Sequence, residues 1–186
     1  MSSHTRQQLE TWLGNIDVKA KSVLDCGGSQ NPIKGRTKSW EVENYQILDL
    51  EKPHQTKRKP DMIGDLNKTD YFGMHNIVFC IEVSEYWYDP FTAIYNIYGA
   101  LDKNGIAYIS THFIYKLHPP EGKDYIRITP FGIEKMLKMN KLKVLEHKLR
   151  TTDSKYLDMF YEEDKMRGKT NINDNVTGSL IKCQKI

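Results

Sequence analysis

The sequence predicts one α/β domain, residues 1–186, built on a mostly parallel sheet. Short apolar runs alternate along the chain with segments of helical periodicity, which is typical of parallel strands joined by helical crossovers. Several of these runs end in an acidic residue or at a glycine turn, so polar groups gather where the strands end. At 186 residues, the chain is long enough to bury a substantial core in a single domain.

Seven strands are expected, at residues 22–25, 45–49, 61–63, 76–80, 106–110, 142–149 and 179–183. No helix long enough for a parallel crossover is evident between the last two, so we expect a hairpin and an antiparallel last strand within residues 177–186. The polar segment before it, residues 150–176, is expected to be a loop. Gly178 is interpreted as the turn signal that precedes the strand.

The first helix is expected within an N-terminal region, residues 1–20. Its apolar positions recur at helical spacing from about residue 5 to 13, and Gly14 follows as a stop signal. Residues 32–40 contain proline, glycine, threonine and serine, which interrupt a helix. The crossover after the first strand is therefore expected to be short or a loop.

Two further helices carry the same start signal. Asp89-Pro90 and Thr129-Pro130 each place a capping side chain before proline at the first helical position. The earlier helix is expected to close at the turn formed by residues 102–105, and the later one near Asn140.

The glycine turn after the first strand is the most informative feature of the chain. Asp25 ends an apolar run, and Gly27 and Gly28 follow it. Glycine lets a ligand approach the backbone closely because it has no Cβ. Asp49 ends the second strand, where a carboxylate can accept hydrogen bonds from ribose hydroxyls, with Glu51 as the fallback. The pattern predicts a cofactor that contains a nucleoside.

A dinucleotide fits this turn poorly. The third glycine of the usual fingerprint is absent, and Asn31-Pro32 occupies its place. Asp25 would repel a pyrophosphate but would suit a cationic ligand. The turn, Asp25 and Asp49 together resemble the first motifs of the class I S-adenosylmethionine-dependent methyltransferases, in particular their small, single-domain, type 11-like members.

The resemblance extends over residues 22–149. Residues 61–66 resemble the family's third motif, which implies that Asp65 and Leu66 meet the adenine. Residues 77–86 resemble the fourth, which implies that Glu82 lies beside the methionine portion of the cofactor. The departures are Gly28 and Ser29 in the glycine loop, Asn104 in a later turn, and Tyr86 in place of a common histidine. The family implies a Rossmann-like, doubly wound sheet of strand order 3-2-1-4-5-7-6.

The acceptor side is expected in the segment 111–127, which follows the fifth strand. His112 and His118 are the candidate bases, because an unperturbed histidine titrates near neutral pH. Arg127 lies in a stretch resembling one that ends "Tyr-x-Arg-x-Thr-Pro" in small-molecule methyltransferases. It would either clamp an anionic acceptor or form an ion pair with Glu85 or Asp124. Glu85 and Tyr125 are weaker candidates for the base.

Composition narrows the remaining choices. The net charge of +3 is too small to indicate nucleic acid by itself. No apolar run approaches the length of a membrane helix, and the N-terminus does not resemble a signal peptide. The three cysteines lack the spacing of a metal site or a disulfide framework, which favours buried thiols in a reducing cytoplasm. No metal site is expected.

The expected function is transfer of a methyl group from S-adenosylmethionine to a small or medium-sized acceptor. Two alternatives stay open at this stage. One keeps the fold but methylates a nucleic acid or a protein, and the other is a binding protein that has kept the fold without activity. Cofactor binding separates the second alternative from the enzymes.

Overall fold

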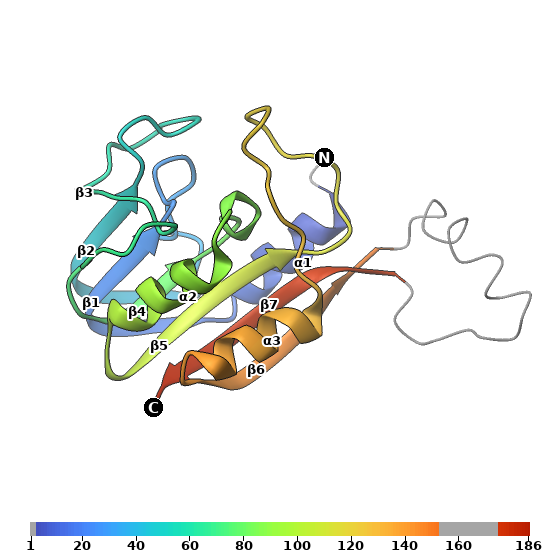
Figure 1. Cartoon of the computed structure of the whole chain (residues 1–186). Coiled ribbons are helices and arrows are strands. Elements are labelled where there is room, and N and C mark those ends of the chain that lie inside the picture. Colours follow the sequence, from blue (N-terminus) through green and yellow to red (C-terminus); the bar gives the residue numbers. More distant parts are fainter. Residues whose placement is uncertain (1–2, 153–174) are drawn as a thin grey trace, which may run out of the picture.

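The computed structural model describes residues 3–152 and 175–186 and shows a seven-stranded sheet covered by helices (Figure 1). The helices are α1 (His4–Leu13), α2 (Pro90–Gly99) and α3 (Pro130–Met139), with a short 3-10 helix η1 (Ser84–Tyr86). The strands are β1 (Asp17–Cys26), β2 (Ser39–Asp49), β3 (Met62–Ile63), β4 (His75–Cys80), β5 (Leu101–His112), β6 (Leu142–Thr151) and β7 (Val176–Lys185).

The strand order is β3-β2-β1-β4-β5-β7-β6. The pairs from β3 to β5 are parallel, whereas β7 is antiparallel to both β5 and β6. The predicted fold class, the antiparallel last strand and the strand order are confirmed. The switch in order beside β1 and β4 brings their carboxyl ends together, which is where open α/β sheets bind ligands.

Two hydrophobic clusters cover the two faces of the sheet. Alternation along β5 shows the division, because Tyr108 faces the cluster of α1, whereas Ala107 and Ile109 face the cluster of α2 and α3. Figure 1 shows α2 and α3 in front of the sheet and α1 behind it. The three helices bury their apolar stripes here, at Leu9, Trp12 and Leu13 in α1, Ile94 and Ile97 in α2, and Ile133 and Leu137 in α3.

Both capping predictions are confirmed. The Asp89 side chain accepts from the Thr92 backbone N–H, and the Thr129 hydroxyl accepts from that of Gly132. The expected close of α2 at residues 102–105 is wrong, because the helix ends at Gly99 and these residues belong to β5. The pairing register between β4 and β5 shifts at these residues, so the strand is irregular here. Within this irregular part, Asn104 has a left-handed backbone conformation at φ 63°.

The connections from β1 to β2 and from β2 to β3 contain no helix among the described residues, as residues 32–40 predicted for the first of them. The N-terminal region was expected to extend to residue 20, but β1 already begins at Asp17. This start is earlier because the whole strand pairs with β2. No helix in the described parts of the chain is long and apolar enough to cross a membrane.

The expected loop at residues 150–176 begins too early and ends too late. Arg150 and Thr151 belong to β6, and Val176 opens β7. Gly178 lies inside β7 rather than in a turn before it, paired with His112 on one side and Arg150 on the other. Strand pairing overrides the polar composition of these positions. The rest of the expected loop, residues 153–174, lies outside the described residues.

Gly178 should tolerate no side chain. An added Cβ would lie 2.1 Å from the backbone oxygen of Thr111, so Gly178→Ala must push β7 away from β5. We expect a loss of about 1–3 kcal/mol in the free energy of unfolding, the usual range for overpacking, measured by urea denaturation. The matched control is Gly99→Ala in α2, where an added Cβ meets no atom within 4 Å. It should be neutral or stabilising, and equal stability of the two variants would contradict the prediction.

Candidate functional site

One cavity of about 960 Å³ opens at the carboxyl ends of the parallel strands. Its floor contains Cys26 from the end of β1, Asp49 from the end of β2, and Glu82 from the residues after β4. The loop after β5 and the start of α1 form the opposite wall, with Tyr115, His118 and Pro120 from the loop and Ser3, Thr5 and Arg6 from the helix start.

The turn after β1 needs both of its glycines. Gly27 has φ 76°, and an added Cβ would lie 2.4 Å from Cγ2 of Val83. At Gly28, an added Cβ would lie 2.4 Å from Oδ2 of Asp25. Gly27 lines the cavity, whereas Gly28 is packed between the turn and the acid below it. The close approach that the glycines permit is therefore to protein groups, namely Val83 after β4 and Asp25 at the end of β1.

Asp25 lies beneath the turn and does not line the cavity. It is 3% exposed, and its Oδ2 accepts from the Ile33 backbone N–H at 2.8 Å and from the Tyr45 hydroxyl at 2.6 Å. Burial raises the pKa of Asp25 to about 6, against the hydrogen bonds that lower it. These contacts connect the residues on both sides of the turn, so Asp25 holds its shape.

Three of the residues expected at the cofactor line the cavity floor side by side. Asp49 accepts from the backbone N–H groups of Ser29 at 3.2 Å and Leu50 at 2.8 Å, which fixes the direction of its carboxylate. Asp65 and Leu66 lie at the neighbouring strand end and also line the cavity. The sequence had placed all three at this edge of the sheet from their positions after the strands.

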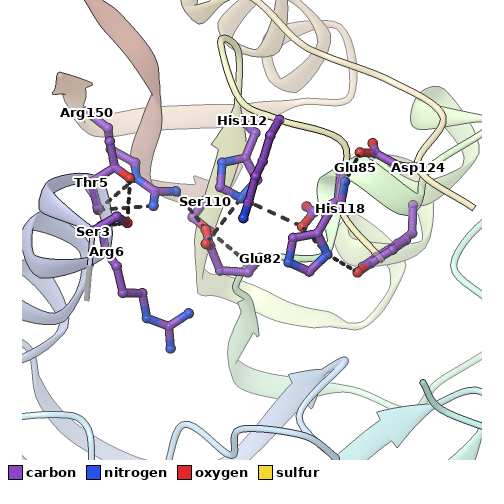
Figure 2. A network of polar contacts seen from close by, with 12 residues as sticks. Ser3, Thr5, Arg6, Glu82, Glu85, Ser110, His112, His118, Asp124 and Arg150 are labelled. Atoms are coloured by element: carbon purple, nitrogen blue, oxygen red, sulfur yellow. Dashed lines mark hydrogen bonds and ion pairs between the residues drawn. The ribbon is translucent and has the colours of Figure 1, made fainter. Parts of the chain in front are cut away.

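Glu82 is the centre of a buried polar network (Figure 2). Its backbone has φ 58°, and its N–H donates to the Ser110 hydroxyl at 2.8 Å. The carboxylate accepts from Arg150 at 2.7 Å, and its Oε2 lies 3.2 Å from Nε2 of His112. Burial by itself would raise the pKa of Glu82, but His112 and Arg150 outweigh it and hold this pKa far below the usual range. The carboxylate is therefore ionised and paired.

Sequence reasoning missed Arg150, which it assigned to a loop. The side chain is 1% exposed, and its other nitrogens donate to the backbone oxygen of Thr5 at 3.1 and 3.3 Å. In the sheet, His112, Gly178 and Arg150 lie in one row across β5, β7 and β6. Gly178 places no side chain between the other two. The sequence offers one weak signal for the pairing of Arg150 with Glu82. It is an arginine at the end of a predicted strand, with a glycine, Gly178, at the start of the last one.

Glu85 is a second buried carboxylate, from η1. Its side chain is fully buried, and neither oxygen accepts a hydrogen bond from the described residues. Its Oε1 lies 3.7 Å from Nε2 of His112 and 3.9 Å from Nδ1 of His118. Burial raises the pKa of Glu85 to about 7. Two histidines thus flank an acid that changes charge near neutral pH.

The structure separates the two candidate bases. His112 is 3% exposed, does not line the cavity and stacks on Tyr115 with ring centres 4.3 Å apart. His118 lines the cavity, and its Nδ1 is hydrogen-bonded to the Tyr86 hydroxyl. Burial lowers the pKa of His118, which favours the neutral form of its ring. Of the two, only His118 reaches the space that an acceptor would occupy.

Solved structures with the same architecture were found by comparison. An S-adenosylmethionine-dependent methyltransferase from Mesorhizobium loti superposes with a TM-score of 0.65 at 13% identity, covering 97% of this chain and 98% of that one. The N-methyltransferase NodS from Bradyrhizobium japonicum, in complex with S-adenosylhomocysteine, gives 0.64 at 12% identity over 99% and 89% of the two chains. The [4+2]-cyclase SpnF gives 0.60 at 13% identity over 97% and 81%.

The chain has the class I methyltransferase fold. No family model and no curated protein sequence matches it, so this statement rests on the three-dimensional similarity and on the strand order. One protein with this architecture, SpnF, is described as a [4+2]-cyclase. The activity must therefore be argued from the site.

In this methyltransferase fold, Arg127 stands outside the cavity lining. Its guanidinium pairs with Asp124 through two nitrogens and also donates to the backbone oxygens of Lys116 at 3.0 Å and Ile126 at 2.9 Å. These contacts span the loop after β5. Of the two roles weighed for Arg127, they favour the ion pair that fixes the loop.

Cys26, Cys80 and Cys183 are free and buried, as expected for core thiols. In the described ranges, no three His, Cys, Asp or Glu side chains come together as a metal site.

The raised pKa of Glu85 predicts a pH-dependent effect of Glu85→Gln. A carboxyl whose folded pKa lies above its unfolded value destabilises the fold as pH rises through the folded pKa. Raising this pKa from 4.5 to about 7 corresponds to roughly 3 kcal/mol at pH 8, at about 1.36 kcal/mol per unit. Glu85→Gln should therefore be more stable than the wild type at pH 8, with the difference shrinking towards pH 4.5.

Denaturation across this pH range is the measurement. Glu121→Gln, which removes an exposed carboxylate from the same side of the molecule, is the control and should show no such trend. A Glu85→Gln protein that is equally destabilised at every pH would contradict the prediction.

Proposed function

We propose that the protein is an S-adenosylmethionine-dependent methyltransferase that acts on a small or medium-sized acceptor. The supporting observation is the cavity at the carboxyl ends of the parallel strands, which combines the glycine turn with Asp49, Asp65 and Glu82 on one floor. Similar structures include one solved with S-adenosylhomocysteine. A volume of about 960 Å³ accommodates a nucleoside cofactor and a small acceptor together.

The residues present fit the cofactor. Asp49, with its carboxylate held by two backbone N–H groups, is proposed to accept hydrogen bonds from the ribose hydroxyls. Asp65 and Leu66 are proposed to meet the adenine, and Glu82 to lie beside the methionine portion. Asp25 and Gly28 would act from below, by keeping the turn in shape.

The cofactor, when bound, supplies a methyl group on a positively charged sulfur, which is already a strong electrophile. The chain then has two tasks, namely to align the acceptor with the methyl group and to remove the acceptor's proton. His118 is the proposed base, since it lines the cavity and since burial, by lowering its pKa, favours the neutral ring. Arg127 is proposed to hold the loop that carries it.

The loop between β5 and α3 is the proposed acceptor wall. It is tied to the body of the protein by backbone bonds from Tyr125 to the oxygen of Glu85 at 2.8 Å and from Ile128 to that of His112 at 3.1 Å. Aromatic side chains line this side of the cavity, namely Tyr86, Trp87, Tyr88, Tyr115 and Tyr125. A loop held at both ends and lined by rings suits a small acceptor that is enclosed rather than a polymer that lies across the surface.

Binding of S-adenosylhomocysteine should raise the melting temperature. A ligand that binds only the native state at about 100 times its dissociation constant stabilises the protein by roughly 2.7 kcal/mol. Differential scanning fluorimetry measures the shift, and calorimetry measures the affinity. NAD is the control and should give no shift, because the turn lacks the pyrophosphate fingerprint. If millimolar S-adenosylhomocysteine gives neither a shift in melting temperature nor a calorimetric binding signal, the proposed function is wrong.

Asp49→Ala should weaken binding of S-adenosylhomocysteine by about 1.5–3 kcal/mol for each charge-assisted hydrogen bond lost. Its side chain is a cleft acid outside both hydrophobic clusters, so the protein should still fold. Glu51→Ala is the matched control, since Glu51 is exposed and does not line the cavity. If calorimetry shows the loss in Glu51→Ala and not in Asp49→Ala, the ribose role belongs to Glu51.

A further inference from the structure

We propose that His118 is held as the Nδ1–H tautomer by Tyr86 and Pro119, so that its Nε2 lone pair is the general base, and that Glu85 stabilises the imidazolium formed when Nε2 takes a proton. The inference rests on the proposed function and deepens it. His118 would be the catalytic residue, whereas Tyr86 and Glu85 would be positioning residues that act through it.

The hydrogen bonds around Nδ1 determine the tautomer. The Tyr86 hydroxyl donates to the backbone oxygen of Pro119 at 2.7 Å, which uses its only proton. The same carbonyl lies 3.0 Å from Nδ1 of His118, and a carbonyl can only accept. With the Tyr86 proton on that carbonyl, both contacts of Nδ1 are satisfied when Nδ1 carries a hydrogen that is shared between the Pro119 oxygen and the phenolic oxygen of Tyr86. In a neutral ring the other nitrogen, Nε2, then has a free lone pair.

That lone pair is available for chemistry. Within the described parts of the chain, Nε2 of His118 has no hydrogen-bond or ion-pair partner, and the side chain is 29% exposed in the wall of the cavity. His112 differs in both respects. It is buried off the cavity, and its Nε2 already faces two carboxylates, those of Glu82 and Glu85. A base must reach the proton that it removes, and His118 meets that condition.

Glu85 lies within reach of an ionic interaction with a positive charge on His118. Its Oε1 is 3.9 Å from the protonated Nδ1, too far for a hydrogen bond but close enough for a strong ionic interaction in a buried site. Figure 2 shows Glu85 beside the two histidines and Asp124 close by. A buried carboxylate with no hydrogen bond is destabilising until a cation forms next to it.

The ionisable groups that face Glu85 come from every element packed against it. They are Cys80 at the end of β4, Glu82 after it, Tyr86 in η1, His112 at the end of β5, and His118, Asp124 and Arg127 in the loop after β5. Asp124 is paired with Arg127, and Glu82 with Arg150, so these two carboxylates already have cations of their own. Glu85 has no such partner among the described residues, so an imidazolium at His118 or His112 would favour its ionised form.

The proposed step conserves atoms and charge. The Nε2 lone pair of His118 takes the proton from the acceptor's O–H or N–H bond. The electron pair left on that oxygen or nitrogen forms the bond to the methyl carbon, and the carbon–sulfur bond breaks with its electrons on sulfur. The ring becomes an imidazolium opposite Glu85, and the proton leaves to solvent when the products depart.

Nitrogen-15 NMR of the histidine rings in the ligand-free, full-length protein tests the tautomer directly. Well above its titration midpoint, His118 should show Nδ1 as the protonated nitrogen and Nε2 as the unprotonated one. Tyr86→Phe should increase the Nε2–H form, whereas the neighbouring Tyr88→Phe should not, because no described residue is hydrogen-bonded to the Tyr88 hydroxyl. A wild-type protein with Nε2–H as the main form overturns the proposal, and an unchanged Tyr86→Phe spectrum removes Tyr86 from it.

The role of Glu85 has its own readout in the same spectra. Glu85→Gln keeps the size of the side chain and removes its charge, so the midpoint of His118 should move to lower pH, while Glu121→Gln leaves it in place. An unmoved midpoint in Glu85→Gln overturns the role of Glu85. These titrations need no acceptor and no cofactor, so their failure is distinct from a failure to bind S-adenosylhomocysteine, which would overturn the proposed function instead.

Discussion

The ion pair between Glu82, which lines the cavity, and the buried Arg150 is the interaction on which the site depends. Glu82 follows β4 at the cavity floor, whereas Arg150 reaches it from the far edge strand β6. A buried charge is tolerated only when it is paired and hydrogen-bonded. Ser110, His112 and the backbone of Thr5 complete this pairing, so β4, β5, β6 and α1 are joined at one point.

Gly178 of β7 lies between the strands that carry His112 and Arg150. Gly178 lies in the row between His112 and Arg150 and lets β7 approach β5 more closely than any side chain would allow. The antiparallel insertion of β7 thus does more than complete the sheet. Gly178 in β7 leaves no side chain between β5 and β6 in this row, and Arg150 reaches across it to Glu82 at the floor of the cavity.

Glu82, which lines the cavity floor, and the two acids buried behind the lining are in different states. Glu82 is ionised and paired, whereas burial raises the pKa of Asp25 to about 6 and that of Glu85 to about 7. Asp25 shapes the turn beneath the cofactor side, and Glu85 lies behind the proposed acceptor wall. Environments that push the pKa values of neighbouring acids apart are a common sign of divided chemical roles, and here the division follows the two halves of the cavity.

Local sequence determined much of the architecture. The N-caps Asp89 and Thr129, the turn at Gly27 and the missing first crossover helix all follow from short-range rules, because capping and backbone conformation are decided within a few residues. The positions of Asp49, Asp65 and Leu66 along the cavity also follow, since strand ends in a parallel sheet share an edge. Their contacts with a cofactor stay predictions.

The roles of Arg150, Glu85 and His118 depend on the tertiary structure, because contacts between distant parts of the chain determine them. Arg150 reads as part of a polar loop until β6 is paired with β7, and its partner Glu82 is 68 residues away. The burial of Glu85 and the exposure of His118 rather than His112 depend on how the loop after β5 folds back onto η1. No local rule contains that information, because the free energy that buries these charges comes from groups brought together only by the sheet.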